Sequence, residues 1–220
     1  GSDVCWAPVP IRHGMTLGEL ALYFKQTVFA KAKLDVQVCL ADGWPRERLF
    51  EDCSLPWVPP SPNLPTPETA LLYAGMCLFE GVNMNEGRGT ETPFLTIGAP
   101  WLDADRTAAA VSDAELAGCR LETIRYTPRA IPGKAEHPVY QNEACQGLTV
   151  HVRDSYAVRS FTVAVALLSA IRRLHGTHLE WKPYFHVLAG GPWLHKQIKD
   201  GVPALEIARG LEGDLAAFER

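Results

Sequence analysis

The segment LPWVPPSPNLPTPETA, which begins at Leu55, carries six prolines between Pro56 and Pro67. Each proline fixes its own φ and lacks the N–H group that a helix or a central strand needs. This density of prolines excludes both structures and predicts a stiff, extended loop. The connection from Asp42 to Thr69 is also too long to be passive in a compact domain. We therefore expect it to build a surface or to cover part of the protein.

Helical and strand patterns intermix along the rest of the chain. Helices are predicted where apolar residues recur every three or four positions between capping signals, and strands where apolar and β-branched residues alternate. The expected helices are residues 17–26, 68–73, 103–118 and 157–176, with two or three short helices after residue 192, and the expected strands are 34–41, 93–101, 119–129 and 147–154. The pattern predicts an α/β or α+β fold with a mixed sheet, flanking helices and two long functional loops.

Size and charge narrow the classes of protein. A chain of 220 residues, 47% of them hydrophobic, can bury a core, and we expect one domain over residues 3–220 after a tag remnant at residues 1–2. The net charge of −4 and the scattered Lys and Arg residues offer phosphate no basic face, so no nucleic acid partner is expected. The longest apolar run, Phe161–Ile171, has about half of the roughly 20 residues that span a bilayer, so no membrane insertion is expected.

A second loop, LFEGVNMNEGRGTETPF over residues 78–94, gathers charged and backbone-permissive residues between two apolar runs. Its glycines allow a positive φ or a close approach of a ligand to the backbone. Its polar side chains supply charges and paired amide hydrogen bonds, and they are Glu80, Asn83, Asn85, Glu86 and Arg88. A loop of this kind suits a polyhydroxylated ligand such as a sugar. A purely structural interpretation is also open, in which Glu86 pairs with Arg88, the glycines form tight turns and Asn83 caps a helix.

The proline loop offers a second set of candidate binding groups. Trp57, Ser61 and Asn63 stand on a rigid frame, which positions side chains at little entropic cost. Trp57, Trp101 and Trp181 are candidates for stacking on sugar faces, although tryptophan is more often a core residue. The loop can equally be a lid or a packing brace.

The chain has no spacing that is typical of a metal site or a nucleotide site. Its six cysteines include no C-x-x-C pair, its histidines follow no known ligand pattern, and G-x-x-x-x-G-K-[ST] does not occur. We therefore predict neither a metal nor a cofactor.

Four blocks of sequence, in order, resemble the signature blocks of a known family. They are RHGMTLGELA, LPWVPPSPNLPT, YAGMCLFEGVNMNEGRGTETPFLTIGAPW and ACQGLTVHV, which cover most of residues 11–152. Two later segments, LEWKP and EGDLAAFER, resemble the C-terminal pattern of the same family. The family is that of the bacterial exo-β-N-acetylmuramidases of the NamZ type, formerly a domain of unknown function, and the resemblance is to its C-terminal domain.

The resemblance implies a glycoside hydrolase that removes terminal N-acetylmuramic acid from the non-reducing end of peptidoglycan fragments. Family members have a Rossmann-like N-terminal domain, a C-terminal domain and an active site in the cleft between them. The expected partners are therefore a missing Rossmann-like domain and a glycan that contains muramic acid, and the 220 residues alone are expected to be inactive. The resemblance also implies a periplasmic or secreted protein, with a cytoplasmic one left open.

The resemblance gives the two loops specific roles. Glu80 and Glu86 lie on the family's signature loop and are the candidate catalytic residues, each as an acid, a base or a hydrogen-bond acceptor for ring hydroxyl groups, because glycosidases generally need two carboxylates. The resemblance also implies that the carboxylate usually proposed as catalytic lies in the missing domain. Arg88 is the implied partner of the lactyl carboxylate that distinguishes muramic acid from glucosamine, since its planar fork matches a carboxylate. The other implied substrate-binding residues are Trp57, Ser61, Asn63, Asn83 and Trp101. The alternative function is a non-catalytic carbohydrate-binding or scaffold module.

Overall fold

The computed structural model describes residues 7, 9–43 and 45–218, whose backbone contacts form two compact units. The smaller unit is Val9–Leu55, and the larger one holds the chain from Pro56 on. Each unit is described by itself. The expected tag remnant lies outside the described residues. The single domain over residues 3–220 stays a prediction, because two compact units can belong to one domain or to two.

The smaller unit is built around helix α1 (Leu17–Thr27), followed by the short 3-10 helix η1 (Phe50–Cys53). The predicted capping box is confirmed: the Thr16 hydroxyl accepts from the Glu19 amide at 3.2 Å, and the Glu19 carboxylate accepts from the Thr16 amide at 2.7 Å. The strand predicted over residues 34–41 is wrong, because these residues form no strand. An alternating pattern becomes a strand only where a second strand accepts its hydrogen bonds, and the described part of this unit offers none.

The larger unit contains a three-stranded antiparallel sheet in the order β1-β3-β2. Its strands are β1 (Thr96–Ala99), β2 (Cys119–Tyr126) and β3 (Cys145–Val152). In the register of the sheet, Thr96 faces Thr149 and Tyr126 faces Cys145. Strands β1 and β2 fall within their predicted ranges, and β3 overlaps the predicted range 147–154 but begins at Cys145. The predicted mixture of helices and strands is confirmed.

A pair of glycines in the sheet makes room for the ring of Tyr126. Gly98 on β1 lies opposite Gly147 on β3, and a Cβ on either residue would lie 2.7 Å from a ring carbon of Tyr126. Such a distance is too short for a real contact, so neither position accepts a side chain without rearrangement. The glycines therefore let the Tyr126 side chain cross β3 and β1 toward the loop that precedes β1.

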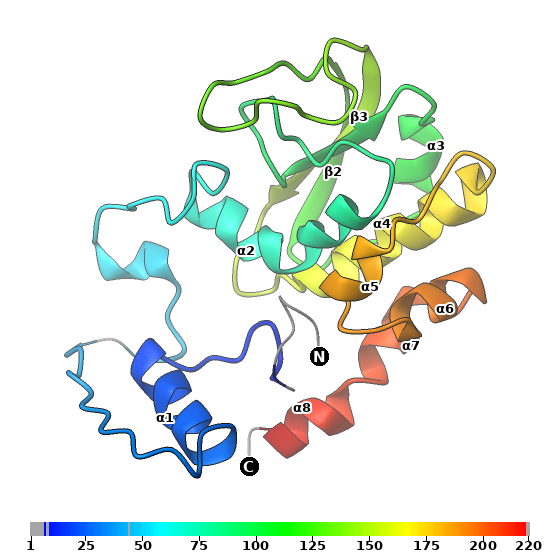
Figure 1. Ribbon diagram of the computed structural model, residues 1–220. Helices are drawn as coiled ribbons and strands as arrows, with labels where there is room; N and C mark the ends of the chain where they lie inside the picture. Colours follow the sequence, from blue (N-terminus) through cyan, green and yellow to red (C-terminus); the bar gives the residue numbers. More distant parts are fainter. Residues whose placement is uncertain (1–6, 8, 44, 219–220) are drawn as a thin grey trace. The chain divides into compact units, whose positions relative to one another are not determined.

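The helices of the larger unit lie below and to one side of this sheet in Figure 1, and α3 packs against β2 and β3. In chain order they are α2 (Pro67–Met76), the 3-10 helix η2 (Cys77–Gly81), α3 (Ala104–Ala109), α4 (Ser160–His175), α5 (Tyr184–Leu188), α6 (Trp193–Lys199), α7 (Ala204–Arg209) and α8 (Glu212–Phe218). The breaks predicted at Gly201 and Gly210 are confirmed. No helix in the described part of the chain is long and apolar enough to cross a membrane.

Helix α3 is shorter than the predicted range 103–118. Asp103 caps it as expected, accepting from the Arg106 amide at 3.0 Å, but the helix ends at Ala109. Beyond it the Glu115 carboxylate accepts from both the amide and the hydroxyl of Ser112, at 2.9 and 2.8 Å. Side-chain bonds of this kind offer the backbone an alternative to the helix, and residues 113–118 form turns.

The core lies around α4, which packs against α2 and carries buried side chains on most of its surface. Gly75 of α2 lies against the Ser160 carbonyl group at the first residue of α4, and a Cβ on Gly75 would overlap that oxygen. The two helices can approach this closely because position 75 has no side chain.

We predict that Gly75→Ala destabilises the protein by about 3 kcal/mol, because the new methyl group meets backbone atoms that cannot move independently of α4. Denaturation with urea measures the free energy of unfolding. Gly213→Ala in α8 is the matched control, since a Cβ there contacts nothing within 4 Å, and it is expected to change stability by no more than about 1 kcal/mol. Equal effects of the two substitutions would contradict the packing described.

Candidate functional site

The 78–94 loop begins at a close contact between η2 and α5. A Cβ on Gly81 would lie 2.5 Å from the Cα atom of Phe185, so this glycine allows close approach of the α5 backbone rather than the predicted positive φ or approach of a ligand. The Lys182 amide donates to the Gly81 carbonyl oxygen at 2.9 Å, and Val82 forms an antiparallel bridge with Trp181. The loop and the segment before α5 are therefore held side by side by main-chain bonds.

Asn83 strengthens the same junction. Its amide nitrogen donates to the His178 carbonyl oxygen at 2.8 Å, and its amide oxygen accepts from the Glu180 amide at 2.8 Å. The predicted helix cap at Asn83 is therefore not what the structure has. Asn83 instead ties residues 178–180 to the loop, and both ends of its side chain are occupied by backbone.

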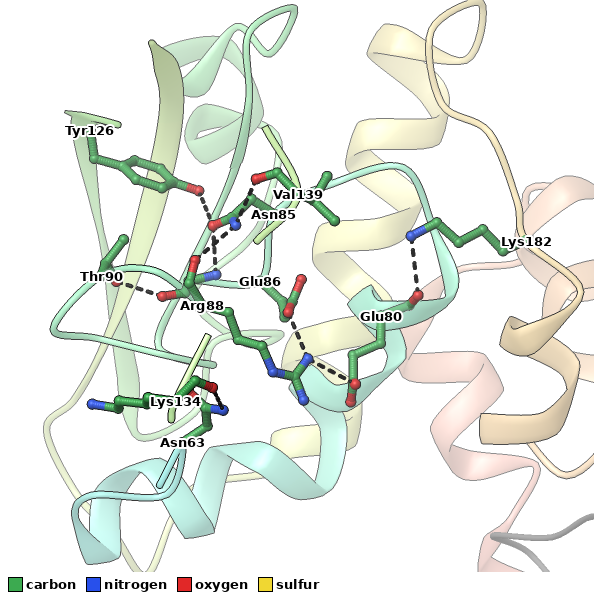
Figure 2. A network of polar contacts seen from close by, with 11 residues as sticks. Asn63, Glu80, Asn85, Glu86, Arg88, Thr90, Tyr126, Lys134, Val139 and Lys182 are labelled. Atoms are coloured by element: carbon green, nitrogen blue, oxygen red, sulfur yellow. Dashed lines mark hydrogen bonds and ion pairs between the residues drawn. The ribbon is translucent and has the colours of Figure 1, made fainter. Parts of the chain in front are cut away.

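Asn85 is fully buried and is the centre of the loop's hydrogen bonds (Figure 2). Its amide nitrogen donates to the carbonyl oxygens of Arg88 and Val139, both at 3.0 Å. Its amide oxygen accepts from the Gly87 amide at 2.9 Å and from the Tyr126 hydroxyl at 3.0 Å. A side-chain amide has two N–H donors and two acceptor lone pairs, so Asn85 is saturated. It thereby joins the loop to the sheet and to the 135–139 segment.

The Tyr126 hydroxyl keeps its donor role because of its surroundings. Burial, the largest cause, raises the pKa of Tyr126 above its usual value, so the phenol stays protonated at neutral pH. Its hydrogen bond thus fixes the orientation of the Asn85 amide group.

Two glycines shape the turn that carries the charged residues. Gly87 and Gly89 both have φ +82°, which side chains rarely tolerate. A Cβ on Gly87 would lie 2.5 Å from the Thr92 carbonyl oxygen, and one on Gly89 would lie 2.6 Å from that of Arg129. The predicted positive φ is confirmed for Gly87 and Gly89, and the close approach of a ligand stays a prediction.

Arg88 lies between two carboxylates. Its Nη1 atom is 2.9 Å from Glu80 Oε2 and 2.6 Å from Glu86 Oε1, and Figure 2 shows the guanidinium group between them. Burial is the largest influence and lowers the pKa of Arg88, but the hydrogen bonds and charges of Glu86 and Glu80 outweigh it and leave this pKa above its usual value. The guanidinium therefore stays charged. The predicted pairing of Glu86 with Arg88 is confirmed.

The Phe94 ring supports this charged group. The guanidinium carbon of Arg88 lies 4.8 Å from the ring centroid, within the range of a cation–π contact. Phe94 has φ +60°, a conformation that costs a bulky residue about 1–3 kcal/mol. The strain is held by the bond from its amide to the Glu86 carbonyl oxygen at 2.7 Å and by edge-on packing against Tyr73 at 4.7 Å.

The three charged side chains open into a pocket of about 350 Å³, within the size range of small-molecule sites. Its other walls are residues 135–139, Lys182 and the exposed ring of Tyr184. Exposed fractions of the side chains are 30% for Arg88, 17% for Glu80 and 6% for Glu86, so all three are partly withdrawn from bulk solvent.

The structure brings Glu80, Glu86 and Arg88 together in this pocket, as predicted for one site. The proline loop contacts the pocket wall indirectly. The side-chain amide nitrogen of Asn63 donates to the Lys134 carbonyl oxygen at 2.8 Å, and Lys134 precedes the lining residue Ala135. The amide oxygen of Asn63 is buried and has no hydrogen-bond partner among the described residues.

Three other predicted binding residues do not line this pocket. Within the proline loop, the Ser61 hydroxyl accepts from the main-chain amide of Asn63 at 3.4 Å. The Trp57 indole donates to the Leu64 carbonyl oxygen at 3.2 Å. The Trp101 indole donates to the Tyr140 hydroxyl at 3.1 Å. Their roles toward a sugar, like that of Asn83, stay predictions.

Sequence reasoning missed four of the polar residues that line the pocket, namely Glu136, His137, Lys182 and Tyr184. A signal existed for two of them. Lys182 belongs to LEWKP, which resembles the family pattern, and His137 precedes Pro138 in an irregular segment between two strands. Nothing in the sequence indicated that these distant segments meet the 78–94 loop.

The pocket gathers several kinds of polar group in one place. A small α/β unit presents paired carboxylates, two cations and an exposed aromatic ring in one pocket. These are the groups that hold sugar hydroxyl groups and carry out chemistry at glycosidic bonds.

Comparison with known proteins identifies the family. The model of the exo-β-N-acetylmuramidase NamZ C-terminal family matches residues 71–220, and that of the NamZ N-terminal family matches residues 1–68. The chain therefore belongs to the NamZ family of exo-β-N-acetylmuramidases. The N-terminal match adds to the resemblance, which pointed to the C-terminal domain alone.

Individual relatives agree with this assignment. The peptidoglycan β-N-acetylmuramidase NamZ of Bacillus subtilis (strain 168) is 31% identical over 97% of this chain and 50% of its own length. Two crystal structures of DUF1343 family proteins from Bacteroides fragilis NCTC 9343 are also similar. The first has a TM-score of 0.75 and 30% identity over 94% of this chain and 53% of its own. The second has a TM-score of 0.76 and 20% sequence identity, and the match covers 96% of this chain and 56% of the B. fragilis chain. At this identity it supports the fold alone. The chain thus spans about half the length of these relatives.

We predict that Asn85→Asp destabilises the protein by about 3 kcal/mol, because a carboxylate oxygen replaces the donor that faces the Arg88 and Val139 carbonyl groups. Unfolding in guanidinium chloride measures this loss. Asn142→Asp makes the same chemical change at an exposed residue and is expected to alter stability by less than about 0.5 kcal/mol. A fully stable Asn85→Asp variant would contradict the central place of Asn85.

Proposed function

We propose that this chain forms the sugar-binding part of a peptidoglycan glycoside hydrolase that releases terminal N-acetylmuramic acid. The family assignment and the activity named for the B. subtilis relative support the class of reaction. The choice of particular residues rests on one observation: Glu80, Arg88 and Glu86 form a charged group at the wall of a pocket of ligand size.

The charge of this group suits glycoside hydrolysis. Two carboxylates share one guanidinium, so the three groups carry a formal excess of one negative charge when all are ionised. Glycosidic bonds break through a transition state with positive charge on the sugar ring. A fixed negative excess in a partly dehydrated pocket stabilises that charge more than water does.

The two carboxylates differ in access to a ligand. Glu80 has 17% of its side chain exposed and Glu86 has 6%, and Glu86 makes the shorter contact with Arg88. In the proposed mechanism both are catalytic: Glu80 contacts the sugar more directly, while Glu86 contributes its charge from deeper in the pocket. Tyr184, a residue that is 41% exposed, offers the sugar a stacking surface.

The rest of the active site is proposed to come from the remainder of the full-length protein. The relatives are about twice as long as this chain, which leaves room for the Rossmann-like half implied by the resemblance. We accordingly propose that the 220 residues bind the sugar but do not hydrolyse glycosides alone, and that the full-length protein works in the periplasm or outside the cell.

A second candidate function is a carbohydrate-binding or scaffold module without catalysis. The observation that favours it is the pairing of both carboxylates with Arg88, which is also how a purely structural ion pair is built. Activity measurements on the full-length protein separate the two functions.

In the full-length protein, we predict that Glu80→Gln and Glu86→Gln each lower kcat for an aryl β-N-acetylmuraminide by at least about 100-fold, because each removes a charge that the transition state needs. Glu143→Gln removes an exposed carboxylate away from the pocket and is expected to leave kcat unchanged. Near-normal turnover by both pocket variants would exclude their catalytic role and favour the binding module.

A further inference from the structure

The charges around the pocket are unevenly matched. Besides His137, the basic side chains that line the pocket are Arg88 and Lys182. The Arg88 charge is already shared by two carboxylates at 2.9 and 2.6 Å. An additional anion near Arg88 would have to compete with both carboxylates and would meet their repulsion.

Lys182 is in the opposite situation. Its side chain is half-buried, and its Nζ atom lies 3.5 Å from the main-chain carbonyl oxygen of Glu80. Among the described residues, no carboxylate oxygen lies within 4.0 Å of the Lys182 Nζ atom, so this side chain forms no ion pair there. A half-buried ammonium group that contacts only a carbonyl oxygen has no anion beside it to neutralise its charge. Its charge is therefore available to an anionic ligand.

The backbone at Lys182 is fixed rather than free. The Lys182 amide donates to the Gly81 carbonyl oxygen, and the neighbouring residue Trp181 forms a bridge with Val82. Asn83 binds the preceding residues through both ends of its amide group. Figure 2 shows the Lys182 side chain reaching toward Glu80 from the side opposite Asn85. The ammonium group is therefore held at the same pocket as the paired carboxylates, but it has no ionic partner in the described part of the chain.

The charges of N-acetylmuramic acid match this arrangement. The sugar differs from N-acetylglucosamine by a lactyl ether on O3, which adds one carboxylate. A ring bound near the Glu80–Arg88–Glu86 group needs a separate cation for that carboxylate, since the group itself has a negative excess.

We propose that Lys182 binds the lactyl carboxylate and so sets the preference of the site for muramic acid over glucosamine. This inference rests on the proposed function and differs from the role that the family resemblance implies for Arg88. In this assignment Arg88 holds the Glu80 and Glu86 carboxylates in place, while Lys182 binds the lactyl group that distinguishes the two sugars.

The test uses the full-length protein and two substrates, an aryl β-N-acetylmuraminide and the matching aryl β-N-acetylglucosaminide. Lys182→Met is expected to lower kcat/KM for the muraminide by about 10- to 100-fold, the range for loss of a charge-assisted hydrogen bond, and to change that for the glucosaminide by less than about threefold. Lys182→Arg keeps the charge and is expected to restore most of the preference. Lys134→Met, outside the pocket lining, is the matched control and is expected to behave as the wild type.

Each result has a distinct meaning. Equal losses for both sugars in Lys182→Met would overturn the assignment, because Lys182 would then not read the lactyl group. A preference kept in Lys182→Met but lost in Arg88→Lys would also overturn it and assign the lactyl group to Arg88. A wild-type protein that hydrolyses neither substrate and binds neither free sugar in calorimetry would remove the proposed function itself, and this inference with it.

Discussion

The buried amide of Asn85 is the interaction on which the rest of the site depends. It joins three segments that are far apart in sequence, the 78–94 loop, the end of β2 and the stretch at Val139, through four hydrogen bonds. These bonds define both the turn that carries Arg88 and one wall of the pocket. A buried polar group costs free energy unless every donor and acceptor is satisfied, so this network holds one loop conformation.

The charged part of the site follows from that scaffold. Once the turn is fixed, Arg88 lies over the strained Phe94 and between Glu80 and Glu86. Carboxylates in a partly buried pocket are stable only beside a cation, and one cation for two acids leaves a negative excess. The close contact between η2 and α5 at Gly81 then brings Lys182 to the same pocket. Packing thereby places a second cation beside a group that carries an excess of negative charge when all its members are ionised.

Sequence reasoning was most successful where local physics decides the structure. The cap at Thr16, the proline loop, the glycine turns and all three strands of the sheet follow from short-range patterns. It was wrong for residues 34–41, where a strand needs a partner that the pattern cannot supply. It also missed Lys182 and Tyr184, because their place in the pocket depends on a contact across about a hundred residues of chain. Asn85 was noticed only as one of two similar asparagines, since burial is not visible in sequence.

The central claim is that the pocket beside Glu80, Glu86 and Arg88 receives a sugar ring. A crystal structure of the full-length protein with N-acetylmuramic acid tests it most directly. The account predicts density for the ring in this pocket, against Tyr184 and within hydrogen-bond distance of Glu80. Clear density for the sugar elsewhere in the protein, with only solvent beside Arg88, would contradict it.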